Sequence, residues 1–246
     1  MALVTGAARG LGHAIALRLA QDGFRVAVND ICDDGRLTAL AGRTGGIAVP
    51  ADISEGTAAA RIVRQTSGML GPVRVLVANA AVMSMGPFLE QEPGEWWRPI
   101  DVNLSGHFRL IQAVLPGMHG LGEGRIVIIA SGWGVVGHRN ATAYAASKAG
   151  LIALTKGMGR ELGPQGIVTN AVAPSYIDTE QLQVDADDLG ISLNDVRQRY
   201  RELIPTHQLA TPGQIAATVA FLAGPGSAGV IGQVLQPGGG VTRARA

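Results

Sequence analysis

The chain has 246 residues, a formal net charge of +1 and a hydrophobic content of 47%. Its length suits one large core, and its mixed charges exclude a basic face for nucleic acid or for an anionic membrane. The N-terminus lacks a leader pattern and no apolar run reaches the roughly 18 residues of a membrane helix, so we expect a cytoplasmic protein. A single cysteine excludes an internal disulfide, and five scattered histidines offer no metal-ligand spacing, so we expect no metal.

Strand and helix patterns alternate along the whole chain, which predicts one α/β domain over residues 1–246. Residues 2–5 form an apolar strand, and a glycine-rich turn with the spacing TGxxxGxG leads from it into a helix. Glycines let backbone approach a ligand closely and the helix N-terminus presents free N–H groups, so this arrangement predicts a pyrophosphate site. The residues of that site are Gly6, Arg9, Gly10, Leu11 and Gly12. The alternative is a tight turn without a ligand.

Asp30 ends the second predicted strand, about 20 residues beyond the glycine turn. A carboxylate at this point accepts hydrogen bonds from the adenosine ribose hydroxyls and repels a 2′-phosphate, so Asp30 predicts NAD. Arg9 favours NADP, because a guanidinium in the turn pairs with a 2′-phosphate. The alternative for Asp30 is an ordinary aspartate in a turn, and the alternative for Arg9 is a solvated residue at the start of the helix. We give Asp30 more weight and expect NAD, with NADP as the alternative.

The next two predicted strands also end in polar or small residues. Asp52 follows the third strand, where its carboxylate either accepts a hydrogen bond from an adenine amino group or starts the next helix. The fourth strand ends at Asn79, Ala80 and Ala81, and small residues there let a cofactor lie against backbone. The alternative for Asn79 is a link within its loop. We expect one cofactor cleft along these strand ends.

Residues 125–130 are apolar and rich in β-branched side chains, which predicts a buried parallel strand with Ser131 at its carboxyl end. A helical pattern begins near residue 143, so Tyr144 and Lys148 share one helix face. We expect the Lys148 cation to lower the tyrosine pKa from its usual value of about 10, and Ser131 to hold a substrate oxygen. Taken one at a time, Ser131 is more simply a cap at a strand end and Tyr144 a core residue. The spacing of Tyr144 and Lys148 also occurs by chance in many helices. Combined with the nucleotide turn, they predict acid/base chemistry on a carbonyl or alcohol.

Asn103 lies in the middle of a predicted helix, where a polar side chain is ordinarily unfavourable. We therefore expect it either to kink the helix or to serve a site. Residues 180–208 are predicted to form a mobile, partly helical insertion that acts as a substrate lid. A capped helix begins at Thr211 with a proline in its first turn, and the last strand lies near residues 233–236.

In this order the motifs resemble those of the short-chain dehydrogenase/reductase family over essentially the whole chain. They are TGAARGLG, Asp52, Asn79-Ala-Ala, Asn103, Ser131, YAASK and APSYIDT. The resemblance implies a Rossmann-like, doubly wound sheet of seven mostly parallel strands with helices on both faces. It also implies an oxidoreductase that transfers a hydride between nicotinamide and a ketone or secondary alcohol. Members are commonly homotetramers paired through the helices that match residues 104–118 and 144–162.

The resemblance implies a role for each matching residue. Tyr144 would be the general acid/base and Ser131 would orient the substrate oxygen. Lys148 would hold the nicotinamide ribose and lower the tyrosine pKa, while Asn103 would bind a water that links the lysine to solvent. Further cofactor contacts are expected from Ile53, Pro174, Ile177 and Thr179.

Two other functions are weighed against an NAD-dependent dehydrogenase of small carbonyls and alcohols. One is an NADPH-dependent 3-oxoacyl thioester reductase that works with an acyl carrier protein. The other is a non-catalytic nucleotide-binding scaffold, although such proteins usually lack the tyrosine or the lysine. By position, the substrate pocket is expected to include Val82, Met83, Trp133, Val135, His138 and Tyr176. These side chains favour an apolar or cyclic substrate, although each of them, His138 above all, equally suits packing.

Overall fold

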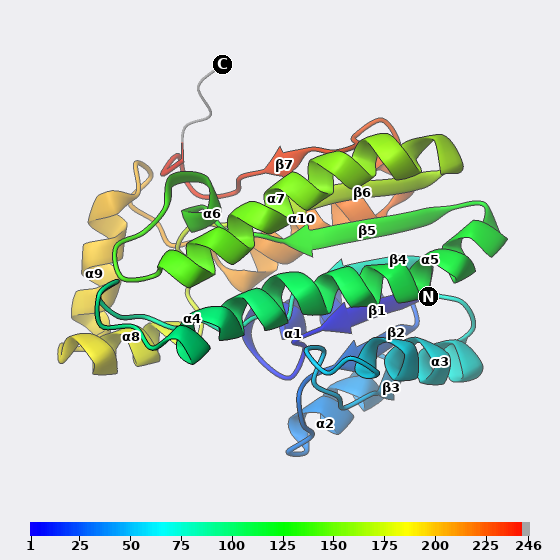
Figure 1. The fold of residues 1–246 in the computed structure, drawn as a ribbon, viewed down its shortest axis with the longest axis horizontal. Helices are drawn as coiled ribbons and strands as arrows, with labels where there is room; N and C mark the ends of the chain where they lie inside the picture. The colour runs from blue at the N-terminus through cyan, green and yellow to red at the C-terminus, as the bar shows by residue number, and fades with distance from the viewer. Residues whose placement is uncertain (243–246) are drawn as a thin grey trace.

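Parallel strands form a single sheet at the centre of the computed structural model, which describes residues 1–242 (Figure 1). Across this described part the sheet has seven strands in the order β3-β2-β1-β4-β5-β6-β7, and every pairing is parallel. Their bounds are β1 (Ala2–Thr5), β2 (Val26–Asn29), β3 (Ile47–Ala48), β4 (Val75–Ala78), β5 (Gly124–Ile129), β6 (Ile167–Val172) and β7 (Val234–Leu235). The strand order reverses between β1 and β4, so the sheet is doubly wound, as predicted.

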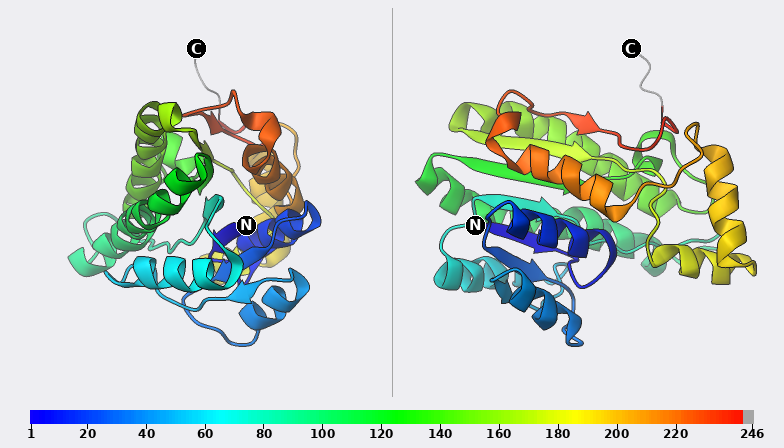
Figure 2. Two further views of the ribbon diagram at one scale, coloured as in Figure 1. Left: turned by 90° about the vertical axis from the view of Figure 1, so that its right-hand side faces the viewer. Right: turned by 180° about the vertical axis from the view of Figure 1, so that it is seen from behind.

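Helices cover both faces of this sheet (Figure 2). Helices α1, α2 and α10 share an apolar core with one face, and helices α3, α5 and α7 share a second core with the other. The helices are α1 (Gly10–Gln21), α2 (Arg36–Arg43), α3 (Ala58–Leu70), α4 (Pro93–Pro99), α5 (His107–Leu121), α6 (Trp133–Val136), α7 (Thr142–Leu162), α8 (Gln181–Leu189), α9 (Leu193–Leu203) and α10 (Pro212–Ala223). Short turns are the π-helical η1 (Ile100–Gly106) and the 3-10 turns η2 (Gly163–Gln165) and η3 (Pro225–Ser227).

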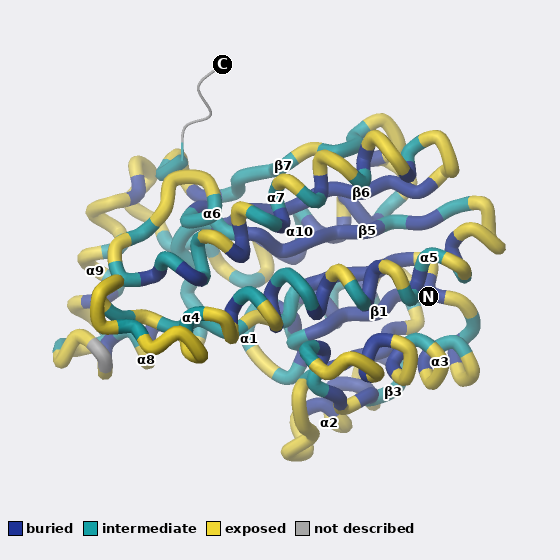
Figure 3. The backbone as a smooth tube through the Cα atoms, in the orientation of Figure 1, coloured by how far each residue is buried: buried dark blue, intermediate teal, exposed yellow. Residues whose placement is uncertain are grey.

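Strand β4 is apolar along its whole length because both of its faces are buried. Leu76 packs into the core under α3, α5 and α7, whereas Val75 and Val77 pack into the core under α1, α2 and α10. Both faces of each central strand are thus withdrawn from water, which requires a continuous apolar run rather than an alternating one. In Figure 3 the strands form a buried centre, and the exposed residues lie on the outer helix surfaces and the loops.

Helices α8 and α9, the helices of the predicted lid, lie beyond the carboxyl ends of the strands (Figure 1). They form the helical part of the insertion predicted at residues 180–208, and they share a small apolar cluster of Leu182, Ala186 and Val196. The edge they face contains the switch point between β1 and β4, where open α/β sheets bind ligands. Within the described span, no helix combines the length and the apolarity needed to cross a membrane.

Candidate active site

The glycine turn is folded so tightly that Gly6 and Gly12 have no room for a side chain. A Cβ atom on Gly12 would lie 2.0 Å from the Gly6 carbonyl oxygen, and Gly6 itself has a φ of 63°. The Asn79 amide donates to the carbonyl oxygens of Thr5 at 2.9 Å and Gly6 at 3.0 Å, which ties the end of β4 to the turn. Asn79 thus has a linking role, and it also lines the cavity described next, so its expected contact with the cofactor stays a prediction. The close backbone packing leaves the N-terminus of α1 open to a ligand.

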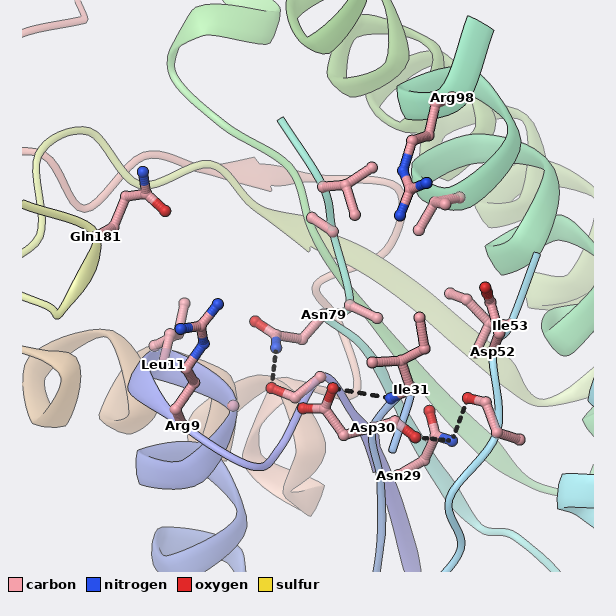
Figure 4. Close-up of a pocket in the computed structure, with 17 residues that line it drawn as sticks. Arg9, Leu11, Asn29, Asp30, Ile31, Asp52, Ile53, Asn79, Arg98 and Gln181 are labelled. Carbon is pink, nitrogen blue, oxygen red and sulfur yellow. Dashed lines mark hydrogen bonds between the residues drawn. The ribbon is translucent and has the colours of Figure 1, made fainter. Parts of the chain in front are cut away.

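A cavity of about 340 Å³ extends along the strand ends beside this turn (Figure 4). It is lined by ten of the predicted cofactor residues, namely Gly6, Arg9, Leu11, Gly12, Asp30, Asp52, Ile53, Asn79, Ala80 and Ala81. Arg9 and Leu11 also line an adjoining cavity of about 170 Å³, to which Gly10, Ile177 and Thr179 contribute. Pro174 lines neither cavity, and its carbonyl oxygen instead accepts the Gly132 N–H at 2.8 Å.

Some lining residues of the larger cavity, among them Arg98, Val102 and Gln181, carry no signal in the motifs. Arg98 enters it from α4, Val102 comes from η1, and Gln181 begins the lid helix α8. In Figure 4 the guanidinium of Arg98 points into the cavity from the side opposite the glycine turn. Only the packing of α4 and α8 over the sheet edge brings these side chains to the cleft, so spacing along the chain does not reveal them.

The two acidic residues at the strand ends each accept two hydrogen bonds, Asp30 through both carboxylate oxygens and Asp52 through one. The Asp30 carboxylate accepts the N–H groups of Ala8 at 2.9 Å and of Ile31 at 2.8 Å, so it braces the glycine turn. Asp52 accepts both the N–H and the hydroxyl of Ser54 through one oxygen. The interpretation of Asp52 as the start of a helix is wrong, because α3 begins only at Ala58. Each carboxylate keeps unused acceptor capacity toward the cavity that it lines.

Ser131, Tyr144 and Lys148 meet at the carboxyl end of β5. Ser131 follows the strand closely and its hydroxyl accepts the Trp133 N–H at 3.2 Å. Lys148 is 1% exposed, its ammonium donates to the Ile129 carbonyl at 2.7 Å, and it lies 5.5 Å from the centre of the Tyr144 ring. The predicted strand and helix therefore bring the three side chains together, with Ser131 and Tyr144 lining one further cavity.

Burial shifts the pKa values of Tyr144 and Lys148 in opposite directions. Burial raises the pKa of Tyr144 to about 12, while a hydrogen bond from Ser131 acts in the opposite direction. Burial also lowers the pKa of Lys148 to about 7. The expectation that Lys148 lowers the pKa of Tyr144 is thus wrong on balance for the isolated chain. The reason is that burial removes the phenol from water, which disfavours the charged phenolate.

Asn103 lies fully buried within η1, where the helix departs from α geometry. Its amide donates to the Val82 carbonyl at 2.9 Å and to the Ser147 hydroxyl at 3.0 Å, and its oxygen accepts the Val82 N–H at 2.9 Å. Ser147 in turn donates to the Tyr144 carbonyl oxygen at 2.7 Å. Asn103 therefore connects the loop after β4 to the helix that presents Tyr144 and Lys148.

Comparison with known proteins agrees with this geometry. A family model described as enoyl-(acyl carrier protein) reductase matches residues 6–242. The 3-oxoacyl-(acyl-carrier-protein) reductase FabG of Staphylococcus epidermidis is 36% identical over 245 residues, which are 98% of this chain and 98% of the relative. The chain belongs to the short-chain dehydrogenase/reductase family. It is accordingly an NAD(P)-dependent oxidoreductase that acts on a carbonyl or alcohol group.

Other members of the family are similarly close. The short-chain dehydrogenase/reductase eriH of Hericium erinaceus is 38% identical over 250 residues, covering 98% of this chain and 96% of the relative. A solved variant of actinorhodin polyketide ketoreductase with NADPH has a TM-score of 0.93 at 34% identity, covering 99% of this chain and 97% of that one. Levodione reductase has a TM-score of 0.92 at 28% identity, covering 97% and 96%. The Rossmann-like fold predicted for this family is therefore confirmed.

A cavity of about 190 Å³ adjoins the Ser131–Tyr144 pair, as a reductase of this family requires. Of the predicted substrate residues, Met83, Trp133 and Tyr176 line it. Val82 instead lines the cofactor cavity, whereas Val135 is exposed at 44% and His138 stacks on Trp133 with ring centroids 3.7 Å apart. The packing role considered for His138 is therefore the one observed. Asp185 and Tyr200 also line the cavity, and nothing in the sequence distinguishes them from other lid residues.

Proposed function

We propose that Tyr144 is the general acid/base of a ketone/secondary alcohol oxidoreductase, with Ser131 holding the reacting oxygen and Lys148 the cofactor ribose. The observation that carries this proposal is that Ser131 and Tyr144 line a cavity beside a backbone cradle that admits no Cβ at Gly12. A nicotinamide cofactor whose pyrophosphate is held by that cradle would supply or accept the hydride. The raised pKa of Tyr144 keeps its proton in place at neutral pH, which suits a donor to a ketone oxygen.

The Tyr144→Phe variant tests this role because it removes only the hydroxyl. We expect kcat for ketone reduction to fall by about 10²–10⁴-fold, the usual contribution of a positioned acid or base. Cofactor affinity, followed by fluorescence titration, should stay close to that of the parent, since the ring and the cradle remain. A variant that binds cofactor normally and keeps kcat close to that of the parent would contradict the assignment.

We propose NAD(H) as the preferred cofactor, on the Asp30 carboxylate that lines the cavity beside the glycine turn. A 2′-phosphate near this carboxylate would meet a like charge. In Figure 4 the Arg9 side chain extends away from Asp30 toward the side of Gln181. Two neighbours support NADP(H) instead: the actinorhodin ketoreductase was solved with NADPH, and a protein from Beutenbergia cavernae with NADP at low occupancy.

The Asp30→Asn variant tests whether NAD(H) or NADP(H) is the preferred cofactor. We expect the parent to bind NADH about tenfold or more tightly than NADPH, and the Asp30→Asn variant to lose most of that difference because the negative charge is gone. Fluorescence titrations with both cofactors measure the ratio. The variant Asp33→Asn, at an exposed position nearby, is the matched control and should keep the parent ratio. A parent that prefers NADPH would contradict the proposal and assign the selectivity to Arg9 or Arg98.

A second candidate is an NADPH-dependent 3-oxoacyl thioester reductase. It is favoured by the Staphylococcus relatives, whose names give 3-oxoacyl-(acyl-carrier-protein) reduction as their activity. Turnover of acetoacetyl-acyl carrier protein well above turnover of free small ketones would establish it. A non-catalytic scaffold is the third candidate, and the presence of both Tyr144 and Lys148 opposes it.

We also propose a cytoplasmic homotetramer that pairs through α5 and α7. Phe108 and Leu121 on α5 support this arrangement, since they are exposed at 46% and 42% in the single chain. Large apolar side chains on one helix are typical of a surface that a second subunit covers. The proposed ligand is a small carbonyl or alcohol compound, without nucleic acid or membrane as a partner.

A further inference from the structure

The cavity beside Tyr144 is small and has aromatic walls. Its volume of about 190 Å³ is below the roughly 300–1,000 Å³ of pockets for drug-sized ligands. Ile177 and Thr179, which line it, also line the cavity next to the glycine turn, so the cofactor takes up part of the same space. The remaining room suits a molecule with a single ring.

Two stacked pairs stiffen these walls. Trp133 lies against His138 with an angle of 13° between the rings, and Tyr176 lies against Tyr200 with centroids 4.3 Å apart and an angle of 24°. Trp133 also meets Tyr144 edge-on at 6.0 Å. Stacked rings hold one another in place, and flat, rigid walls favour a flat or chair-shaped ring over a flexible chain.

Asp185 is the charged member of the described residues that line this cavity. Its carboxylate accepts the Tyr200 hydroxyl at 2.9 Å and the Gln181 amide at 3.1 Å. Two partners leave acceptor capacity on a carboxylate, which takes about four hydrogen bonds in all. The guanidinium of Arg197 does not neutralise it, because Arg197 pairs with Asp178 at 2.9 Å. The lid therefore presents a fixed negative charge to the substrate space.

We propose that the site takes an uncharged, single-ring ketone or alcohol that carries a hydroxyl on the side of the ring away from the reacting carbon. This inference rests on the carbonyl chemistry proposed for Tyr144. In it, Asp185 is a specificity-determining residue that accepts the distal hydroxyl and repels carboxylates and phosphates. A site that pairs its acceptor with a ligand donor selects strongly, because a ligand without the donor leaves the acceptor unpaired.

The test compares three ring ketones of similar size on the full chain: 4-hydroxycyclohexanone, cyclohexanone and 4-oxocyclohexanecarboxylate. Ethyl acetoacetate serves as the acyclic 3-oxo compound. Each is assayed for kcat/KM with the parent, with Asp185→Asn and with Asp187→Asn. Asp187 is the matched control, because it lies on the same helix, is exposed and loses the same charge.

We expect the parent to prefer the hydroxy ketone over the carboxylate by about 100-fold or more, because the carboxylate lacks the donor and adds a like charge. Asp185→Asn should lower kcat/KM for the hydroxy ketone by about tenfold and raise it for the carboxylate by about tenfold, as removal of one charge-assisted hydrogen bond and one repulsion implies. Asp187→Asn should match the parent on all four compounds. The parent preference alone tests the inference if Asp185→Asn proves unstable.

Two outcomes overturn the inference and leave the proposed function standing. One is equal turnover of the carboxylate and the hydroxy ketone by the parent. The other is reduction of ethyl acetoacetate alone, abolished by Tyr144→Phe. A response of Asp187→Asn equal to that of Asp185→Asn also overturns it, since the effect would then be one of net charge. Turnover of neither the cyclic nor the acyclic class would overturn both the inference and the proposed function.

Discussion

Lys148 combines full burial with a charge that changes near neutral pH. It is among the largest side chains fully withdrawn from water, and its ammonium donates a hydrogen bond to the Ile129 carbonyl. Burial brings its pKa down to about 7, so its protonated and neutral forms are similarly populated in neutral solution. A group in this state is costly to bury, which is typical of residues held for function rather than for stability.

The buried His107 makes the free energy of unfolding depend on pH. It is fully buried at the start of α5, and burial together with Lys148 lowers its pKa to about 3, against 6.5 when exposed. Between these values the unfolded chain binds the extra proton, so the contribution of His107 to stability is complete above about pH 6.5 and is lost as pH falls toward 3. By linkage, the loss between about pH 7 and about pH 5 amounts to about 2 kcal/mol.

Replacing His107 by Gln should therefore flatten the stability profile over this range. The measurement is the free energy of unfolding by urea at about pH 7, 6 and 5, where most carboxylates remain ionised. The variant His119→Gln, at an exposed position on the same helix, should keep the slope of the parent. An unchanged slope in His107→Gln would show that other groups cause the acid sensitivity.

Among the elements that form the site, the turn between β1 and α1 has little tolerance for change. In Gly12→Ala the new methyl group would meet the Gly6 carbonyl at 2.0 Å and the Asn79 amide at 2.6 Å, so backbone must move. We expect a loss of about 1–3 kcal/mol in stability, typical of an overpacked site, and roughly a tenfold or greater loss in cofactor affinity. Thermal unfolding and fluorescence titration with NADH measure the two effects.

A glycine in open space provides the control for this substitution. Gly68 lies in α3, and a Cβ added to it would have no neighbouring atom within 4 Å. Gly68→Ala should therefore keep cofactor affinity and raise stability slightly, because alanine restricts the unfolded chain more than glycine does. If Gly12→Ala were equally harmless, the turn would be more plastic than its packing indicates.

The helices of the predicted lid have an apolar cluster of their own. Helices α8 and α9 share the cluster around Leu182, Ala186 and Val196, apart from the two cores on the sheet. The Ser192 capping box starts α9, and the Asp185–Tyr200 hydrogen bond joins the two helices. These local contacts let the lid keep its form while it covers the sheet edge, and we propose that it closes over the substrate as a unit.

At the scale of the whole molecule, one sheet supports both cores and the site. The sheet runs unbroken from β3 to β7, and each face carries three helices. We propose on this ground that residues 1–242 form one domain; residues 243–246 of the predicted domain lie outside the described residues. The carboxyl edge collects residues from distant segments, among them Gly12, Asn79, Tyr144 and Gln181, because parallel strands all end on the same side.

The α/β class, the nucleotide turn and the group of Ser131, Tyr144 and Lys148 could be predicted from the sequence. These follow from local signals: apolar runs, glycine spacing and the one-turn separation of two residues on a helix. The tertiary structure decided what depends on packing between distant segments. It placed Arg98, Gln181 and Asp185 at the cavities and set the direction of the Tyr144 pKa, because burial is a property of the folded chain and leaves no periodic trace along it.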